Sequence, residues 1–274
     1  MSRRLRFART RTGAIGLVLL AAIVLLALFG PFFAPHAPAE SLGRPGAGPS
    51  GVYPLGLDFL GRDVLSRALW GGRSVLGLAI AATAVSYALG LAVGLTAGYS
   101  RSFVDPALMR SVDVVRAFPP LLFFLILVTG VGTSVLVLVL GVAVVQSPGI
   151  ARLVHTATKE VSYRGYVEAA VARGEHGVAV VRRDVLPNIM SPLIADAGLR
   201  FTFSILLVAA VNFLGLGLRP PAADWALMIS ENRQIITLNP WSIFVPAALI
   251  ALLTIAMNLV GDSIARSLGR SEGS

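Results

Sequence analysis

Six stretches of the sequence are each long and apolar enough to cross a lipid bilayer as a helix. A helix needs about 20 mostly apolar residues to span a hydrocarbon core of about 30 Å. Because backbone polar groups in lipid must be satisfied within the segment, we predict an all-α polytopic membrane protein with six transmembrane helices. The stretches lie at about residues 13–34, 74–98, 117–132, 133–152, 190–217 and 241–263.

The third stretch is the weakest, because it is short and contains Pro119-Pro120 near its start. Proline inside a helix removes a backbone hydrogen bond and clashes with the preceding turn, so this pair predicts either a kink or a late helix start. We expect the helix itself to begin further back in the chain, near Asp105.

The first 34 residues also have the outline of a secretory signal peptide, since arginines precede an apolar run. The run from Gly13 to Phe33 is longer than a typical signal-peptide core of roughly 7–15 residues, so we interpret it as a membrane helix. The composition agrees with this interpretation. Hydrophobic residues make up 55% of the chain and charged residues 14%, which is more apolar surface than one soluble core could bury.

The formal charge of +9 fits either a nucleic-acid-binding protein or an asymmetric membrane topology, and the positions of the basic residues decide between them. With a cytoplasmic N-terminus, sixteen Lys and Arg residues fall inside, six outside, and Arg200 lies within the fifth span. This is the positive-inside pattern, so we expect contact with membrane lipid and none with nucleic acid. The inside residues are Arg3, Arg4, Arg6, Arg9, Arg11, Arg101, Arg110, Arg116, Arg152, Lys159, Arg164, Arg173, Arg182, Arg183, Arg266 and Arg270.

The same topology predicts how the chain is divided. An interfacial helix is expected over Gly61–Gly72, where apolar residues share one face and Asp63 precedes Arg67 by four residues. A role in bracing the second span is favoured for this helix over contact with a ligand. The predicted divisions are a cytoplasmic tail at 1–12, a first transmembrane helix at 13–34, an external loop with the interfacial helix at 35–73, a transmembrane core at 74–263 that includes a cytoplasmic loop at 153–188, and a cytoplasmic tail at 264–274.

The loop at 153–188 is long for a simple turn and has helical organisation of its own. Residues Tyr166–Arg173 are rich in helix formers and stop at Gly174, which suits the left-handed conformation that closes a helix. A second short helix is expected around Val178–Val185, with Pro187 ending it. Together the two short helices predict a knob that projects into the cytoplasm.

The sequence of this knob resembles the EAA loop of ABC importer permeases. Glu168-Ala169-Ala170 is followed by Gly174 and then by Leu186-Pro187, after the fourth of six spans and on the predicted inner side. In that family the loop is the coupling helix, which docks into a cleft of the cytoplasmic ATPase. The resemblance implies ATPase coupling at Tyr166, Glu168, Ala169, Ala170, Gly174, Leu186 and Pro187.

Further segments look like the dipeptide, oligopeptide and nickel permeases, and specifically like the second, shorter permease of the pair. The likeness runs in register from about residue 50 to 270. His155 and Val208 depart from it, since arginine and an acidic residue are usual there. The matching segments are Pro54-Leu55-Gly56, Gly61–Arg67, Asp105 with Met109-Arg110 and Val112-Asp113, Phe213–Gly217, Pro220-Pro221 and Asn258–Asp262.

This resemblance implies the type I ABC importer permease (MetI-like) fold, in a bacterial inner membrane, with both termini cytoplasmic. It also implies partners: a second homologous permease subunit, two cytoplasmic ATP-binding subunits and an extracytoplasmic solute-binding protein. The implied cargo is a dipeptide or oligopeptide, with nickel chelates and haem as alternatives. An ion-coupled secondary transporter is the rival class, but no repeat with broken half-helices is evident.

Enzymatic chemistry is disfavoured by the residues present. The chain has no cysteine, and its three histidines (His36, His155 and His176) are scattered without metal-ligand spacing. A P-loop requires a glycine-rich run ending in Gly-Lys-Ser/Thr, but the only lysine, Lys159, is followed by Glu160. We therefore expect no catalytic residue, metal or cofactor in this chain, and expect ATP to be hydrolysed by partner subunits.

Asp196 and Arg200 are the charged residues of the fifth span. An arginine at the bilayer centre is unfavourable by about 2.5–3.5 kcal/mol or more unless compensated, and Asp196, four residues earlier, can pair with it. Two interpretations remain: a structural ion pair near the inner interface, which is favoured, or a place on the translocation pathway that meets the charged ends of a peptide. Other polar residues are expected to be nearly absent from the spans, which also argues against a membrane-embedded enzyme.

Overall fold

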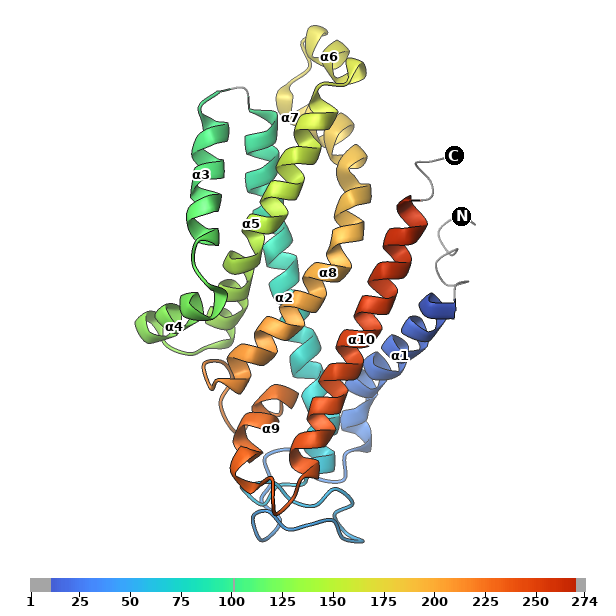
Figure 1. Ribbon diagram of the computed structural model, residues 1–274, viewed down its shortest axis with the longest axis vertical. Helices are drawn as coiled ribbons and strands as arrows, with labels where there is room; N and C mark the ends of the chain where they lie inside the picture. The colour runs from blue at the N-terminus through green and yellow to red at the C-terminus, as the bar shows by residue number, and fades with distance from the viewer. Residues whose placement is uncertain (1–10, 101, 270–274) are drawn as a thin grey trace.

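The computed structural model describes residues 11–100 and 102–269, and within them the chain is an elongated bundle of helices (Figure 1). The only extended pairings in these ranges are isolated bridges between Ser41 and Arg62 and between Leu57 and Asp63. The expected all-α fold is therefore confirmed. Residues 1–10 of the predicted N-terminal tail, with Arg101 and Arg270, lie outside the described residues.

Five parts of the described chain are long and apolar enough to cross a membrane, and there are six if one bent pair counts as a single span. The five contain α1 (Arg11–Phe29), α2 (Val64–Tyr99), α5 (Val135–Ser162), α8 (Leu186–Phe213) and α10 (Trp241–Gly269). The bent pair is α3 (Val104–Arg116) and α4 (Pro120–Val131). The short elements are η2 (Gly30–Phe33), α6 (Gly165–Ala172), α7 (Gly177–Val180), η3 (Val181–Val185), α9 (Trp225–Asn232) and η4 (Arg233–Ile235).

Helices α2 and α5 lie side by side along most of their length, and glycines on α2 explain how closely they approach. A Cβ atom added at Gly90 would lie 2.5 Å from the side chain of Ile150, and one added at Gly94 would lie 2.6 Å from the carbonyl oxygen of Ala151. Small residues at such a seam let two backbones pack closely in lipid, where van der Waals contact drives helix association. The α2–α5 seam therefore forms the axis of the bundle.

Helix α1 packs on α10, and α10 in turn crosses α8. At the crossing, a Cβ atom added at Gly198 would lie 3.2 Å from the Cα atom of Gly261. The two backbones thus touch through a pair of glycines. Beyond this crossing, toward α6, the α1–α10 pair and α8 diverge in the view of Figure 1.

The predicted interfacial helix over Gly61–Gly72 is wrong as a separate element. Helix α2 begins at Val64 and continues without a break to Tyr99, so residues 64–72 are its first turns. Asp63 is the N-cap, and its carboxylate accepts hydrogen bonds from the backbone N–H groups of Leu65 and Ser66. The amphipathic pattern reflects burial of this segment in the protein rather than a position at the membrane surface.

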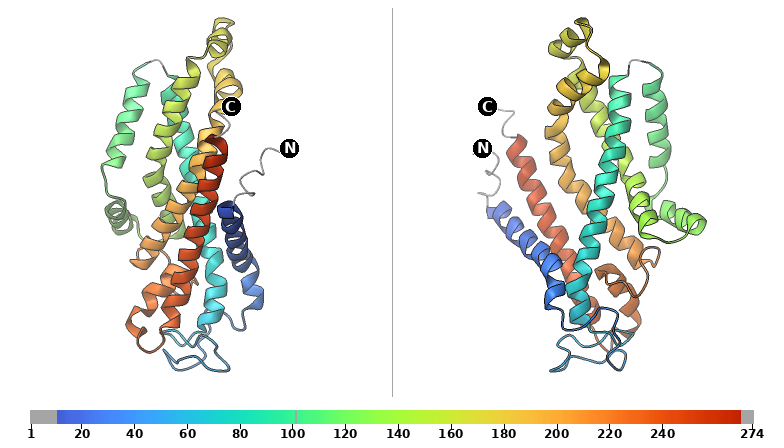
Figure 2. Two further views of the ribbon diagram at one scale, coloured as in Figure 1. Left: turned by 45° about the vertical axis from the view of Figure 1, so that its right-hand side comes forward. Right: turned by 180° about the vertical axis from the view of Figure 1, so that it is seen from behind.

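The weak third stretch is broken, as Pro119-Pro120 predicted. Helix α3 contains the expected start near Asp105, but it ends at Arg116, and α4 leaves at 87° to it. Pro119 adopts an extended conformation (φ −60°, ψ 132°) and Pro120 opens α4. Helix α4 therefore extends sideways from the bundle, at the side where α3 also lies (Figures 1 and 2).

The second short helix of the 153–188 loop does not end at Pro187. The chain runs from α7 through one π-helical segment, η3, directly into α8, and Pro187 lies in the first turn of α8. Proline is tolerated there because the first N–H groups of a helix have no partner within it. The fifth span is thus continuous with the knob, from Gly177 to Phe213.

The end of the bundle opposite α6 is closed by residues 34–63, the start of α2 and α9, and we call it the α9 end (Figure 1). Its centre is a buried ion network. The guanidinium groups of Arg62 and Arg67 both contact Oε2 of Glu231, at 2.7 and 2.9 Å, and both contact Oδ2 of Asp58, at 2.6 and 3.4 Å. All four side chains are 5% exposed or less.

This network joins segments that are distant in sequence. Arg67 also donates hydrogen bonds to the carbonyl oxygens of Pro38 and Ala222, at 3.0 and 3.1 Å. Burial raises the pKa of Glu231, while the nearby charges of Arg67 and Arg62 oppose that shift. The loop at residues 34–63 and α9 are thereby fixed to the start of α2.

Candidate functional site

Helix α6 lies at the opposite end of the molecule, next to α7, and we call this end the α6 end (Figures 1 and 2). It starts after Arg164, whose backbone is extended, and ends before Gly174, which has φ +81°. The N–H of Glu175 donates to the carbonyl oxygen of Ala170 at 3.2 Å, which closes the helix. The helix and its glycine stop confirm the structure predicted for Tyr166–Gly174.

The two faces of α6 differ in what they contact. Val167 and Ala170 are each 1% exposed and pack in one apolar cluster with Val180, Val185 and Ile189 of the segment leading into α8. Of the residues expected to contact an ATPase, Ala170 is buried and Leu186 packs against this cluster. The others, Tyr166, Glu168, Ala169, Gly174 and Pro187, are exposed.

A polar cavity of about 460 Å³ lies at the root of α6. Asp105 of α3 lies in its wall and receives a hydrogen bond from Lys159 of α5, with the two groups 2.5 Å apart. Nε2 of His155 lies 2.7 Å from the other oxygen of Asp105. Glu168 of α6 lines the same cavity, so the knob, α3 and α5 meet around it.

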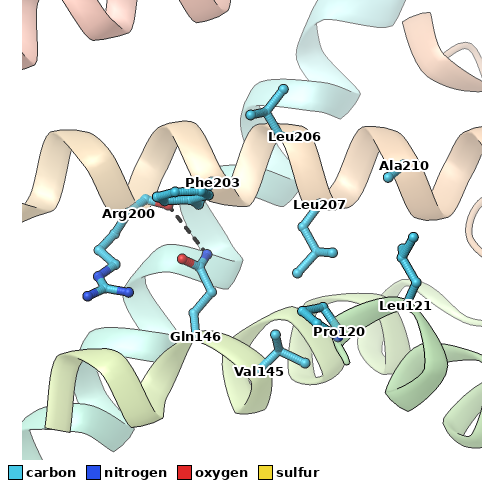
Figure 3. A pocket seen from close by; sticks show the side chains of 9 residues that line it. All are labelled: Pro120, Leu121, Val145, Gln146, Arg200, Phe203, Leu206, Leu207 and Ala210. Atoms are coloured by element: carbon cyan, nitrogen blue, oxygen red, sulfur yellow. Dashed lines mark hydrogen bonds between the residues drawn. The ribbon is translucent and has the colours of Figure 1, made fainter. Parts of the chain in front are cut away.

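A second cavity, of about 380 Å³, lies between α4, α5 and α8 (Figure 3). Its wall is apolar except at one end, where Gln146 and Arg200 stand. Pro120 and Leu121 from the first turn of α4 lie at the other end. The lining residues are Pro120, Leu121, Val145, Gln146, Arg200, Phe203, Leu206, Leu207 and Ala210.

Arg200 is paired as the sequence predicted. Its Nε donates to Oδ2 of Asp196 at 2.9 Å, and the same oxygen accepts a hydrogen bond from the hydroxyl of Tyr87 at 3.0 Å. The side chains of Arg200 and Asp196 are 23% and 18% exposed. Arg200 lies midway along α8.

Polar side chains of three helices converge beside this pair. Nε2 of Gln146 donates to Oγ of Ser204 at 2.5 Å, and the hydroxyls of Ser204 and Thr83 are 2.7 Å apart. The expectation that such residues are nearly absent from the spans is therefore wrong. Each is isolated in an apolar stretch, and only the packing of α2, α5 and α8 brings them together. In lipid such groups satisfy one another across helices.

No group of three or more His, Cys, Asp or Glu residues with the geometry of a metal site occurs in the part of the chain that the structure describes. His36 and His155 each contact an aspartate, Asp63 and Asp105 respectively, at separate places. The residues that line the two cavities offer hydrogen bonds, charge and apolar contact.

Residues 90–272 match the family model described as the binding-protein-dependent transport system inner membrane component. Residues 3–44 match a second model, the N-terminal transmembrane domain of oligopeptide transport permease C. The chain belongs to this family of transport permeases. The resemblance stated from the sequence is thereby confirmed, and the family is one of membrane transport components and not of enzymes.

Curated relatives align over nearly the whole chain. The di/tripeptide transport system permease protein DppC of Pseudomonas aeruginosa (strain UCBPP-PA14) is 35% identical over 96% of this chain and 89% of its own length. The dipeptide transport system permease protein DppC of Alkalihalophilus pseudofirmus is 31% identical over 95% and 86%. The glutathione transport system permease protein GsiD of Pectobacterium atrosepticum is 32% identical over 96% and 88%.

Two solved structures share the fold. A chain of the MetNI methionine ABC transporter in inward-facing conformations superposes with a TM-score of 0.59, at 20% identity, over 75% of this chain and 96% of that one. A chain of an amino acid ABC transporter with histidines gives 0.56, at 17% identity, over 73% and 93%. The type I ABC importer permease fold expected from the sequence is confirmed.

Proposed function

We propose that this permease is one of two membrane subunits of an ATP-driven importer of peptides, with dipeptides and short oligopeptides as cargo. The observation that carries the proposal is the 35% identity to a di/tripeptide permease over 96% of the chain. The match of residues 3–44 to the oligopeptide permease C domain supports it, because that segment lies outside the common family core.

The partners in this proposal are a second homologous permease, two cytoplasmic ATP-binding subunits and an extracytoplasmic solute-binding protein. The exposed apolar side chains of α4 and α8 support a second permease on the face that carries the 380 Å³ cavity. Leu122 and Ile126 of α4 are 54% and 61% exposed, and Phe203 of α8 is 56% exposed. Closing this face with a homologous subunit would place the cavity between the two permeases.

ATPase coupling is assigned to α6. Its exposed residues Tyr166, Glu168 and Ala169 form the docking surface, and Val167 and Ala170 fix the helix to the segment that enters α8. Because Val167 and Ala170 pack on that segment, and it continues into the span from Gly177, a displacement of α6 is passed to α8 through these buried contacts and the short turn at residues 173–176. Such motion gives alternating access by rigid-body rearrangement of packed helices.

Orientation follows from the same assignment. The α6 end is cytoplasmic, as are both termini, since the described start of α1 and end of α10 point toward the α6 end (Figure 1). The α9 end is extracytoplasmic and faces the binding protein. Asp196 and Arg200 then lie on the pathway midway between the two sides.

The test is uptake of a labelled dipeptide into proteoliposomes that contain the complete importer and internal ATP. We expect ATP-dependent accumulation by the wild type, and loss of accumulation with normal membrane insertion when Glu168 is replaced by Ala. Arg182→Ala on η3, also exposed but outside the α6 surface, is the matched control and should transport normally. Accumulation of a nickel chelate or haem instead of the dipeptide would overturn the peptide assignment.

Topology is tested separately by a single thiol, since the chain has no cysteine of its own. Ala169→Cys should react with a membrane-impermeant maleimide only after the cytoplasmic side is opened. Labelling of intact cells at this position would place α6 outside and would contradict the coupling role.

A further inference from the structure

We propose that an apolar groove between α8 and α10 receives one helix of the second permease, the counterpart of α4, and that α4 packs in turn into the matching groove of that partner. Because the partner is a homologous permease, this inference rests on the proposed function, to which it adds the two contact surfaces. The permeases would then be held together by a reciprocal exchange of helices.

The groove has a volume of about 460 Å³ and is lined by Leu206 of α8, Ile229 of α9 and side chains from residues 247–255 of α10. Thr254 is the polar residue among them, and its hydroxyl donates to the carbonyl oxygen of Ile250 in the same helix at 2.8 Å. The groove therefore offers an occupant apolar contact rather than hydrogen bonds. A helix suits such a wall because its backbone groups are satisfied internally, whereas an extended chain would leave its own unpaired.

Small residues of α10 give the groove its depth. Ala247 and Ala251, four residues apart and so on one face of the helix, both line it. Small side chains let a neighbouring helix approach closely in lipid, where van der Waals packing drives helix association. Ile255, one turn further along, lines the same groove and is 50% exposed. This part of α10 can therefore accept large apolar side chains from another helix.

Helix α4 carries large apolar side chains of that kind. Its inner side is fixed to α5 by Phe124, which is 0% exposed and lies so close to Gly141 that a Cβ atom added there would be 2.6 Å from the ring. On the other side of the helix, Leu122, Leu125 and Ile126 are 54%, 46% and 61% exposed. These three residues have the spacing of neighbours on one helix face. They form an exposed apolar ridge along α4.

The groove and α4 lie on one continuous face of the bundle. Leu206 lines the groove and also the 380 Å³ cavity that Pro120 and Leu121 of α4 close at its far end, so the two hollows flank this one side chain. In Figure 1, α8 stands between α4 on one side and α10 on the other. The face that a second permease covers in the proposed importer thus continues from α4 across α8 to the groove.

The symmetry of two homologous permeases determines what covers the groove. Both must present their α6 helices to the same side of the membrane, so the approximate two-fold axis that relates them runs along the bundle. A half-turn about such an axis in front of α8 exchanges the two sides of this face and brings the partner's counterpart of α4 opposite α10. In a two-fold interface each contact occurs twice with the partners exchanged. The same rotation therefore places α4 in the groove of the partner.

The experiment places the photoreactive amino acid benzoylphenylalanine at position 255, in place of Ile255, in the purified complete importer in lipid nanodiscs. Mass spectrometry of the crosslinked peptides should find the helix of the second permease that aligns with α4. The same reagent in place of Ile126 should react with the partner's counterpart of α10. Position 80 is the matched control, since Ile80 of α2 is 57% exposed but lines neither hollow, and it should give no crosslink to a permease.

Two substitutions test the fit of the groove. Ala251→Phe fills it, and the overpacking should raise the dissociation constant of the permease pair about ten-fold, a factor that corresponds to about 1.4 kcal/mol. Ala248→Phe is the control, because Ala248 is exposed on the same helix but does not line the groove, and it should leave the constant unchanged. The constant is measured by exchange of a fluorescently labelled permease subunit. Equal weakening by both variants would contradict a specific role of the groove.

The outcomes separate this inference from the proposed function. A crosslink from position 255 to lipid alone, to a second copy of this chain or to another part of the second permease overturns the helix exchange while the importer stands. A purified assembly that lacks a second permease overturns the proposed function, and the helix exchange with it. Crosslinks from positions 255 and 126 to the expected helices, without one from position 80, support the exchange.

Discussion

Two arginines of the α9 end, Arg62 and Arg67, are buried, whereas Arg164 and Arg173 at the α6 end are exposed. Arg67 and Arg62 are 0% and 2% exposed and share one carboxylate oxygen of Glu231. The side chains of Arg164 and Arg173 are 52% and 63% exposed beside their glutamates. A buried charge that loses its partner is left in a low dielectric, while an exposed charge is solvated in either case.

In the proposed importer the two ends have different tasks. The ion network fixes the loop and α9 to α2, which suits the reproducible docking of the proposed binding protein. Helix α6 is attached mainly through the apolar contacts of Val167 and Ala170, so its position follows the segment that enters α8. Substitutions at the two ends should therefore change the stability of the protein by different amounts.

The largest effect is expected from Glu231→Ala, which leaves Arg62 and Arg67 buried with one carboxylate fewer. We expect the free energy of unfolding to fall by about 3–5 kcal/mol, measured by reversible denaturation in mixed micelles. The matched change at the α6 end, Glu160→Ala, removes the exposed partner of Arg164 and serves as the control. A similar loss in both variants would remove the distinction between the two ends.

A smaller effect is expected from Gly94→Ala in the α2–α5 seam, which connects the two ends. The new methyl group would lie too close to the backbone oxygen of Ala151, and only a separation of the two helices would relieve this contact. Overpacking of this kind lowers stability by about 1–3 kcal/mol. Gly77→Ala, where nothing lies within 4 Å, should leave the melting temperature unchanged or slightly raised.

At the α6 end, Gly174→Ala introduces a side chain where φ is +81°. The left-handed conformation is unfavourable for alanine by about 1–2 kcal/mol, and we expect this to appear as faster hydrogen exchange in α6 only. The overall melting temperature should stay the same, because few buried contacts depend on the knob. Gly165→Ala, without a positive φ, is the control. Faster exchange at the α9 end in Gly174→Ala would show that the two ends are coupled more tightly than proposed.

The smallest effect is expected from Arg173→Ala, which removes the contact of 2.7 Å with Glu175. An exposed pair contributes about 0–1 kcal/mol and is screened by salt. The stability difference from the wild type should therefore be below about 0.5 kcal/mol and should vanish at 1 M salt. A larger difference that persists in salt would indicate that this pair stabilises α6 after all.

The sequence predicted the features that depend on local pattern. Apolar length identified the spans, Pro119-Pro120 identified the break before α4, and Gly174 identified the end of α6. Each of these signals acts within a few residues, since helix length, proline geometry and a left-handed glycine are properties of the local chain. The family resemblance then added the fold.

The features that sequence reasoning missed depend on residues far apart in the chain. The sequence placed Arg67 on an interfacial helix four residues after Asp63, and its contact with Glu231, 164 residues away, has no local signal. Gln146 and Ser204 looked like isolated polar residues in apolar stretches, and they meet only because α5 packs on α8. The amphipathic start of α2 was predicted to be a surface helix. An apolar helix face indicates burial, but it does not show whether protein or a membrane interface covers that face.

The contact between Gly198 and Gly261 has a consequence for motion. If α8 tilts about that contact, its two halves swing in opposite directions, since Leu186 lies about 18 Å from Gly198 along the helix and Phe213 about 22 Å on the other side. Arg200, only about 3 Å from the pivot, stays almost still. Such a tilt would open one mouth of the proposed pathway while it narrows the other, around a charge whose position hardly changes.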